Sequence, residues 1–196
     1  MAGDSRLDAA DPIQEALVLG AAALDRHAVR YALIGGLATG YRSRPRYTKD
    51  IDFIVDVPAV TLPGLLADLR ERGFQFDEPT VIAEFAQHHM AVLWRAGVRF
   101  DWLKPILPAY RHVLDRATLE EAEPQPLRVA TAEGLILLKL LAFRLQDQTD
   151  IEALVAANRP ALDLAWIKSE WEAIFPLDDP RMRWLVEQVE SAPPTG

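Results

Sequence analysis

The feature that most constrains the fold of this chain is an apolar segment with aspartates at alternate positions. Residues 50–55 read DIDFIV. Because alternate side chains of a strand point to the same face, Asp50 and Asp52 project together, away from an apolar layer. Two adjacent carboxylates repel each other unless a cation lies between them, and Mg²⁺ prefers hard oxygen ligands together with substrate phosphates. The segment therefore predicts a strand that carries a metal site next to a phosphate-containing substrate.

A pair of glycines precedes this strand. Residues 31–34 are typical of a short buried strand and residues 37–41 can begin a helix, so Gly35 and Gly36 lie at a strand-to-helix turn. The free backbone N–H groups of such a turn can hold phosphate oxygens. A Gly-Gly pair is as often a plain turn, however, so its phosphate-binding role depends on the carboxylates nearby.

A third carboxylate is predicted on a β-hairpin. Residues 90–94 and 98–103 flank the glycine-containing turn 95–97. In the second strand Asp101 faces away from the apolar side chains at alternate positions. An aspartate in a strand of this composition runs against β propensity, and such conflicts concentrate at functional sites. The alternative is an aspartate on the solvent-exposed face of a half-buried strand.

An apolar helix is predicted after Thr131, which is a suitable N-cap. Lys139 and Arg144 are the only charged residues in its second half, and charges in a buried helix require an anionic partner. They are candidates for binding a charged substrate.

A second helix is predicted to follow, ending near residue 158. Asp147 is a candidate substrate-binding residue at its start. Asp147 and Asp150 are also explained as the N-cap and N3 residues of this helix, and the two roles can coexist.

Basic residues cluster before the first aspartate: Arg42, Arg44, Arg46 and Lys49. They are candidates for contact with a triphosphate or an RNA backbone, and a solvated loop is the ordinary alternative. The formal net charge of −8 argues against a protein that coats nucleic acid non-specifically.

The composition suits a core-forming protein of 196 residues with 50% hydrophobic residues. The chain has no cysteine, which excludes disulfides and suits a cytoplasmic setting. No run is long enough for a membrane span, and no apolar signal segment opens the sequence. We expect a mixed α+β fold: a small mixed sheet with helices over residues 11–105, and a mainly helical region over residues 106–190 that packs on it.

The order of strand, Gly-Gly, helix, linker and a strand with Asp-x-Asp resembles the nucleotidyltransferase superfamily, which has a polymerase-beta-like fold. The resemblance implies an NTP-dependent enzyme that transfers a nucleoside monophosphate to an acceptor hydroxyl. It further implies that Asp50, Asp52 and Asp101 bind two Mg²⁺ ions, and that Asp101 takes the proton of the acceptor hydroxyl.

The resemblance also implies how the nucleotide is held. Gly35 and Gly36 would bind phosphate oxygens through the backbone. Lys139, with Arg144 and Lys49, would balance the charge that develops during transfer. The hydroxyl of Thr48 would order the loop before Asp50.

The segment from Lys139 to Asp150 is similar to a Lys-x-x-Ala-x-x-Arg, Lys-Asp-x-x-Asp pattern of the AbiEii/MenT-like, toxin-associated nucleotidyltransferases. This implies a tRNA or other RNA acceptor and a cognate antitoxin. Gln146 and Leu37 depart from that pattern and leave the nucleotide preference open. Two alternatives remain: a nucleotidyltransferase for small molecules of the antibiotic type, and an inactive fold that serves as a binding or regulatory partner.

Overall fold

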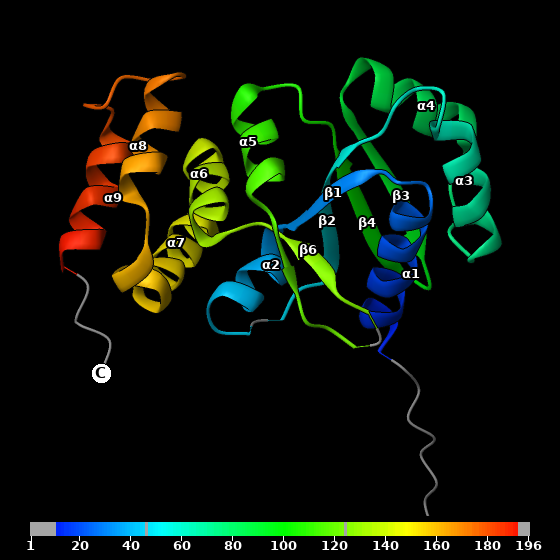
Figure 1. Ribbon diagram of the computed structural model, residues 1–196, viewed down its shortest axis with the longest axis horizontal. Coiled ribbons are helices and arrows are strands. Elements are labelled where there is room, and N and C mark those ends of the chain that lie inside the picture. Colours follow the sequence, from blue (N-terminus) through cyan, green and yellow to red (C-terminus); the bar gives the residue numbers. More distant parts are fainter. Residues whose placement is uncertain (1–10, 46, 124, 192–196) are drawn as a thin grey trace, which may run out of the picture.

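The structure is a computed structural model that describes residues 11–45, 47–123 and 125–191. Its centre is a six-stranded mixed sheet with the strand order β3-β4-β2-β1-β6-β5 (Figure 1). The strands are β1 (Arg30–Ile34), β2 (Asp50–Asp56), β3 (Met90–Arg95), β4 (Val98–Leu103), β5 (Thr118–Glu120) and β6 (Leu127–Val129).

Helices lie around this sheet and extend from one side of it. They are α1 (Pro12–Arg26), α2 (Gly35–Arg42), α3 (Leu62–Glu71), α4 (Glu78–Gln87), α5 (Pro108–Arg116), α6 (Ala132–Ala142), α7 (Leu145–Asn158), α8 (Leu164–Glu172) and α9 (Pro180–Ser191), with a 3₁₀ turn η1 (Arg159–Ala161) after α7. Figure 1 shows α6 to α9 grouped on one side of the sheet and α1, α3 and α4 toward the other. No helix in the described ranges has the length and apolarity to cross a membrane.

The apolar face of β2 and β4 forms the centre of the core. The rings of Phe53 and Phe100 lie 5.2 Å apart between centroids, and Phe53 also meets Tyr31 edge-on. Gly20 of α1 leaves the space that the ring of Phe100 fills, because a β-carbon there would overlap with it. Burying these aromatic side chains stabilises the sheet and forces the alternate residues of β2 and β4 onto the opposite face.

The strands of the expected core are confirmed, and the sheet is larger than we expected. β5 and β6 come from the region that we predicted to be mainly helical, and β6 pairs in parallel with β1 through Leu33 and Val129. Strands of three residues are too short for a recognisable alternation of apolar and polar side chains. The division at residues 105 and 106 stays a prediction, although the sheet crosses it.

The two helices after Thr131 are confirmed, with one correction at their junction. Thr131 caps α6 by accepting the N–H of Gly134 at 3.2 Å, and Phe143 ends the helix with a left-handed backbone (φ 48°). Arg144 is the N-cap residue of α7, so Asp147 is at N3 and not at the N-cap. Asp147 accepts the backbone N–H of Arg144 at 3.1 Å, which completes a capping interaction that favours a carboxylate at this position.

Candidate active site

Three aspartates lie next to one another on the face of the sheet opposite the aromatic core. β2 and β4 pair in parallel with Asp52 directly opposite Asp101. Asp50 lies on the same face of β2, two residues before Asp52. Asp50 is exposed, whereas Asp52 and Asp101 are half-buried. We call Asp50, Asp52 and Asp101 the carboxylate row, and the expected proximity of the three side chains follows from this register.

Asp52 lies in the least favourable environment of the three for a charged carboxylate. Burial, together with the negative charges of Asp101 and Asp50, raises the pKa of Asp52 to about 6. The positive charges of Lys139 and Arg99 act in the opposite direction without offsetting this rise. A cation placed at Asp52 would therefore be strongly favoured by electrostatics.

The backbone conformation and the close packing at position 35 require a glycine. Its φ of 68° is in the left-handed region, and a β-carbon at this position would overlap with the carboxylate of Asp52. The backbone at the start of α2 thus lies directly against the carboxylate row. Gly36 is buried in the first turn of α2. Among the described residues, no side chain caps the N–H groups at the N-terminus of this helix.

The carboxylate row has the donor chemistry of a Mg²⁺ site, but its side chains do not converge. Carboxylate oxygens from two adjacent strands match what Mg²⁺ takes from proteins, namely one or two carboxylates, with water and phosphates completing the shell. Yet Asp101 Oδ1 is turned toward Arg99, whose Nε donates to it at 2.7 Å. In the described ranges no three His, Cys, Asp or Glu side chains form a ready-made metal site. The three carboxylates fit the ion by their donor atoms, and one oxygen of Asp101 is engaged by Arg99.

A cavity of about 450 Å³ opens beside Asp52, between the sheet and the helices α5 and α6. One part of its wall is polar, with Gly35, Asp52, Lys139, Arg144 and Asp147. The other part is mainly apolar and consists of Ile34, Met90, Leu103, Tyr110, Leu135, Leu138 and Ala142. The cavity thus has separate surfaces for a charged group and for an apolar or aromatic group.

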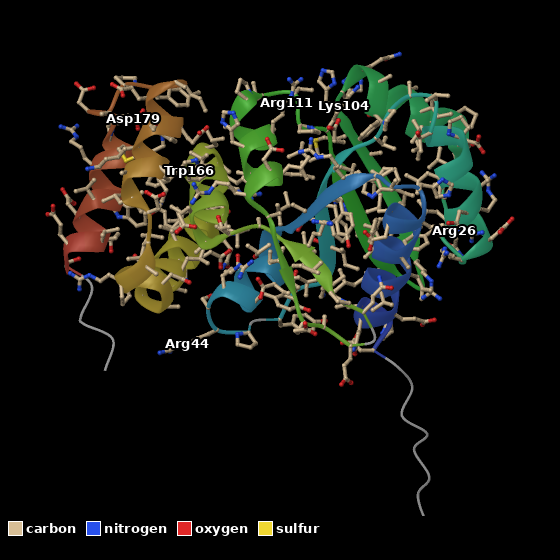
Figure 2. The ribbon with its side chains drawn as sticks, in the orientation of Figure 1. Arg26, Arg44, Lys104, Arg111, Trp166 and Asp179 are labelled. Atoms are coloured by element: carbon tan, nitrogen blue, oxygen red, sulfur yellow. The ribbon has the colours of Figure 1, made fainter. Side chains whose placement is uncertain are left out.

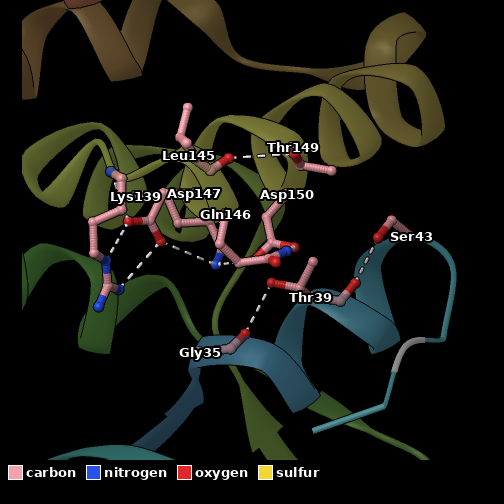
Figure 3. Close-up of polar contacts among 10 residues, drawn as sticks. Gly35, Thr39, Ser43, Lys139, Leu145, Gln146, Asp147, Thr149 and Asp150 are labelled. Carbon is pink, nitrogen blue, oxygen red and sulfur yellow. Dashed lines mark hydrogen bonds and ion pairs between the residues drawn. The ribbon is translucent and has the colours of Figure 1, made fainter.

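Lys139 is buried in a network of charges on α6 and α7, which Figure 3 shows facing the first turns of α2. Its Nζ donates to Asp150 Oδ2 at 2.6 Å and lies 3.8 Å from Asp147 Oδ1. Arg144 Nε donates to Asp147 Oδ2 at 2.7 Å, and Gln146 Nε2 donates to Asp150 Oδ1 at 3.1 Å. We call these five residues the buried ion network. Its arginine holds the pKa of the Asp147 carboxyl below the ordinary value, although burial acts in the opposite direction.

The expected basic cluster does not gather at the carboxylate row. Arg42 points to the other side of α2, where it donates to the carbonyl of Ala130 and pairs with Glu120 at 2.8 Å. It joins α2 to β5 and β6 and is not available to a substrate. Figure 2 shows Arg44 at the periphery beside α2, pointing away from the sheet. Arg46 lies outside the described residues.

Lys49 and Thr48 line a different cavity from Asp52. Lys49 is exposed just before β2, and both residues border a second hollow of about 450 Å³ with Leu37, Tyr47 and Val98. The Thr48 hydroxyl lies 3.4 Å from the carbonyl of Asp50, a long hydrogen bond at the start of the strand. Their predicted contact with the nucleotide stays a prediction.

Two polar residues of this region did not stand out in the sequence. Arg99 precedes Asp101 by two residues, and this spacing alone places both on one face of β4. Thr39 is buried in α2 and donates to the carbonyl of Gly35 at 2.8 Å, which steadies the turn beside Asp52 (Figure 3). An i to i−4 hydroxyl contact of this kind has no sequence signal of its own.

Comparison with known proteins identifies the fold. No protein-family model matches the chain, and no curated protein matches it in sequence. An antigenic nucleotidyltransferase-like protein from Paracoccidioides brasiliensis matches 92% of this chain and 94% of its own, with a TM-score of 0.54 and 18% identity. The fold is that of the nucleotidyltransferases. This confirms the mixed α+β fold class, and the fold is the one that the Gly-Gly and Asp-x-Asp motifs indicated.

The antibiotic-resistance factor ANT(2'')-Ia has the same nucleotidyltransferase fold. The match to its solution structure covers 92% of this chain and 98% of the ANT(2'')-Ia chain, with 17% identity and a TM-score of 0.53. The match to its crystal structure in complex with adenylyl-2''-tobramycin covers 82% of this chain and 96% of the ANT(2'')-Ia chain, with 19% identity and the same TM-score. At these identities the likeness shows the fold, and the chemistry has to be argued from the residues of this chain.

Proposed function

We propose that this chain is a Mg²⁺-dependent nucleotidyltransferase that moves a nucleoside monophosphate from an NTP to an acceptor hydroxyl. The observation that carries the proposal is the carboxylate row on a nucleotidyltransferase fold, with Gly35 packed against Asp52. Side-by-side carboxylates at which burial and like charges raise a pKa have little structural use and are typical of a functional site.

The carboxylates divide the work by their positions. Asp50 and Asp52 would hold Mg²⁺, and Asp101 would complete the site from the neighbouring strand. Bound Mg²⁺ would neutralise phosphate charge and lower the pKa of the acceptor hydroxyl. Asp101 would accept the hydroxyl proton as the acceptor oxygen bonds to the α-phosphorus, while the bond to the bridging oxygen breaks and pyrophosphate leaves.

The cavity beside Asp52 would hold the nucleotide. Gly35 lines the polar part, and its backbone N–H, together with that of Gly36 next to it in α2, would bind phosphate oxygens. Arg144 would contribute a charge there, because its side chain is 77% exposed despite its pair with Asp147. Tyr110 and Met90, in the apolar part, would contact the base.

We give Lys139 a different role from the direct phosphate contact that the motif implied. The residue is 7% exposed, and its ammonium is already bonded to Asp150. It lowers the pKa of Asp52 through its charge, so it would tune the carboxylate row from behind. Asp147 would position Arg144 and would not bind the nucleotide itself.

The acceptor that we propose first is tRNA or another RNA, in a toxin-like protein that has a cognate antitoxin. The support is the Lys139 to Asp150 pattern. A small-molecule hydroxyl is the second candidate, supported by the shared fold with ANT(2'')-Ia and by the net charge of −8, which disfavours an extended RNA interface.

The experiment is transfer of α-labelled ATP, CTP, GTP and UTP with Mg²⁺, in separate reactions with total tRNA, with an aminoglycoside, and with no acceptor. Asp52→Asn tests the site. Asp56→Asn is the matched control, because Asp56 lies on the same strand and has a 53% exposed side chain at its far end. We expect the native chain and the Asp56→Asn control to transfer label to one of the acceptors, and Asp52→Asn to transfer none. Equal transfer by a folded Asp52→Asn variant would refute the proposal.

A further inference from the structure

Arg99 lies among the three carboxylates of the proposed metal site. It precedes Asp101 by two residues on β4 and stands directly opposite Asp50 on β2. Its Nε donates to Asp101 Oδ1 at 2.7 Å. Its position is set by the sheet register, because residues opposite one another on paired strands share a face.

The guanidinium interacts with the whole carboxylate row. It is hydrogen-bonded to Asp101 and lies directly across the strand pair from Asp50, while Asp52 is the residue opposite Asp101. Arg99 therefore occupies the electrostatic position that a metal ion bound to the same carboxylates would take.

We propose that Arg99 is a built-in counter-ion, which pairs with Asp101 when no metal is bound and leaves it when Mg²⁺ binds. The inference rests on the proposed function. The reason is competition: Asp101 Oδ1 cannot give the same lone pair to the Arg99 N–H and to the ion, and two cations held at one carboxylate repel each other. The pairing also explains why the three carboxylates do not converge.

Arg99 is able to leave. Its side chain is 41% exposed, whereas that of Asp101 is 18% exposed, so the arginine can rotate into solvent while the aspartate stays. Its cross-strand neighbour on β3 is Trp94, which is itself 46% exposed, so this part of the face is open to solvent in the described structure. The buried ion network differs, because there both Lys139 and its aspartates are enclosed.

An ordinary surface ion pair would give a different result on mutation. Such a pair contributes a little stability and has no consistent effect on metal affinity. A counter-ion that competes with the metal has opposite effects on two measurements: its removal destabilises the metal-free chain and strengthens metal binding. These two signs separate the interpretations without any measurement of activity.

The test is calorimetric titration of the full chain with MgCl₂ at low ionic strength, together with melting temperatures with and without Mg²⁺. Arg99→Gln is expected to bind Mg²⁺ about tenfold more tightly than the native chain, because one nearby positive charge is removed. Its melting temperature is expected to fall without Mg²⁺ and to rise more on adding it. Arg30→Gln is the matched control, since Arg30 also lies on a strand, pairs with Asp115 and is 56% exposed.

A second measurement keeps the proposal testable if Arg99→Gln does not fold. In the native chain, the arginine Nε–H signal that is absent from Arg99→Lys identifies Arg99 in the NMR spectrum. Mg²⁺ is expected to move this signal toward that of a solvated arginine. A signal that stays unchanged while Mg²⁺ binds would overturn the proposal.

The outcomes separate this inference from the proposed function. Transfer by the native chain, combined with unchanged or weaker Mg²⁺ binding by Arg99→Gln, overturns the role of Arg99 alone. Tighter binding by Arg99→Gln, with no label entering any acceptor, supports the counter-ion and refutes the transferase. Absence of Mg²⁺ binding in both proteins overturns both.

Discussion

The carboxylate row and the buried ion network are two charged clusters built from the same kinds of side chain, and they differ in how their charges are matched. In the network, Lys139 is bonded to Asp150 and lies near Asp147, which also pairs with Arg144. In the row, the directly bonded cation found among the described residues is Arg99, which contacts Asp101, and the pKa of Asp52 rises to about 6.

The difference indicates which cluster serves the fold and which is arranged for a ligand. Charges that are buried together must be matched within the protein, because no solvent stabilises them. An excess of negative charge at an open face can instead be matched by something that binds. This contrast supports the row as the proposed site and the network as the contact that holds α6 and α7 together.

The largest expected effect tests the structural role of the network. Lys139→Met removes the buried ammonium that bonds to Asp150 and lies near Asp147, and we expect a loss of about 3–5 kcal/mol in the free energy of unfolding. Lys168→Met, on the partly exposed face of α8, is the control. It should change the free energy of unfolding by less than about 0.5 kcal/mol. Urea denaturation measures both. Similar losses in the two variants would remove the distinction between the clusters.

The next effect concerns the contact between the start of α2 and the row. Gly35→Ala places a β-carbon against the Asp52 carboxylate and requires a left-handed backbone at an alanine. We expect transfer to fall about 100-fold, because small displacements of a reacting group cost this much. The matched control is Gly97→Ala, which also has a positive φ (80°) but has nothing within 4 Å of the added carbon. Equal activity of the two variants would contradict the role of the contact.

The third effect is the pH dependence of stability. The pKa of Asp52 is raised from 3.8 to about 6, so the folded chain binds this proton more tightly than the unfolded chain does. The contribution of Asp52 is most favourable below about pH 4 and is lost as the pH rises through 6. Without divalent cations, the free energy of unfolding of Asp52→Asn should therefore exceed that of the native chain by about 3 kcal/mol at pH 8 and by almost nothing at pH 4. Unfolding curves at both pH values check this, and a constant difference would count against the raised pKa.

The smallest effect distinguishes the exposed edge of the network from its interior. Arg144→Gln removes a side chain that is 77% exposed, so we expect a loss of about 0.5 kcal/mol in unfolding free energy. Nucleotide affinity should fall more clearly, because the phosphate contact is lost. Equilibrium binding of a non-hydrolysable NTP analogue measures this. A large loss of stability with unchanged affinity would place Arg144 with Lys139 as a structural residue.

The sequence predicted the carboxylate row because local rules were sufficient. Alternation places Asp50 and Asp52 on one face, and the hairpin around Gly97 brings Asp101 onto a strand whose apolar residues must face the core. The partner of Lys139 was not predicted. Asp150 was explained as a helix-capping residue, and only the packing of α7 on α6 brings it to the lysine.

The basic cluster shows the same limit. Arg42 and Lys49 are close in the sequence. Yet α2 directs Arg42 toward β6, whereas Lys49 borders a different cavity from the one beside Asp52. β5 and β6 were missed because three-residue strands depend on pairing partners that are distant in the chain.

The sequence by itself determined the strands β1 to β4, the turn at Gly35 and the face on which the aspartates lie, because these follow from backbone geometry and from the alternation of apolar residues. The tertiary structure alone decided which charges meet. Long-range packing decides whether a lysine or an arginine is paired with a carboxylate. It also decides whether the surroundings of Asp52 carry more negative than positive charge. Electrostatic energies depend on distances in space and on burial, and neither is encoded in local sequence spacing.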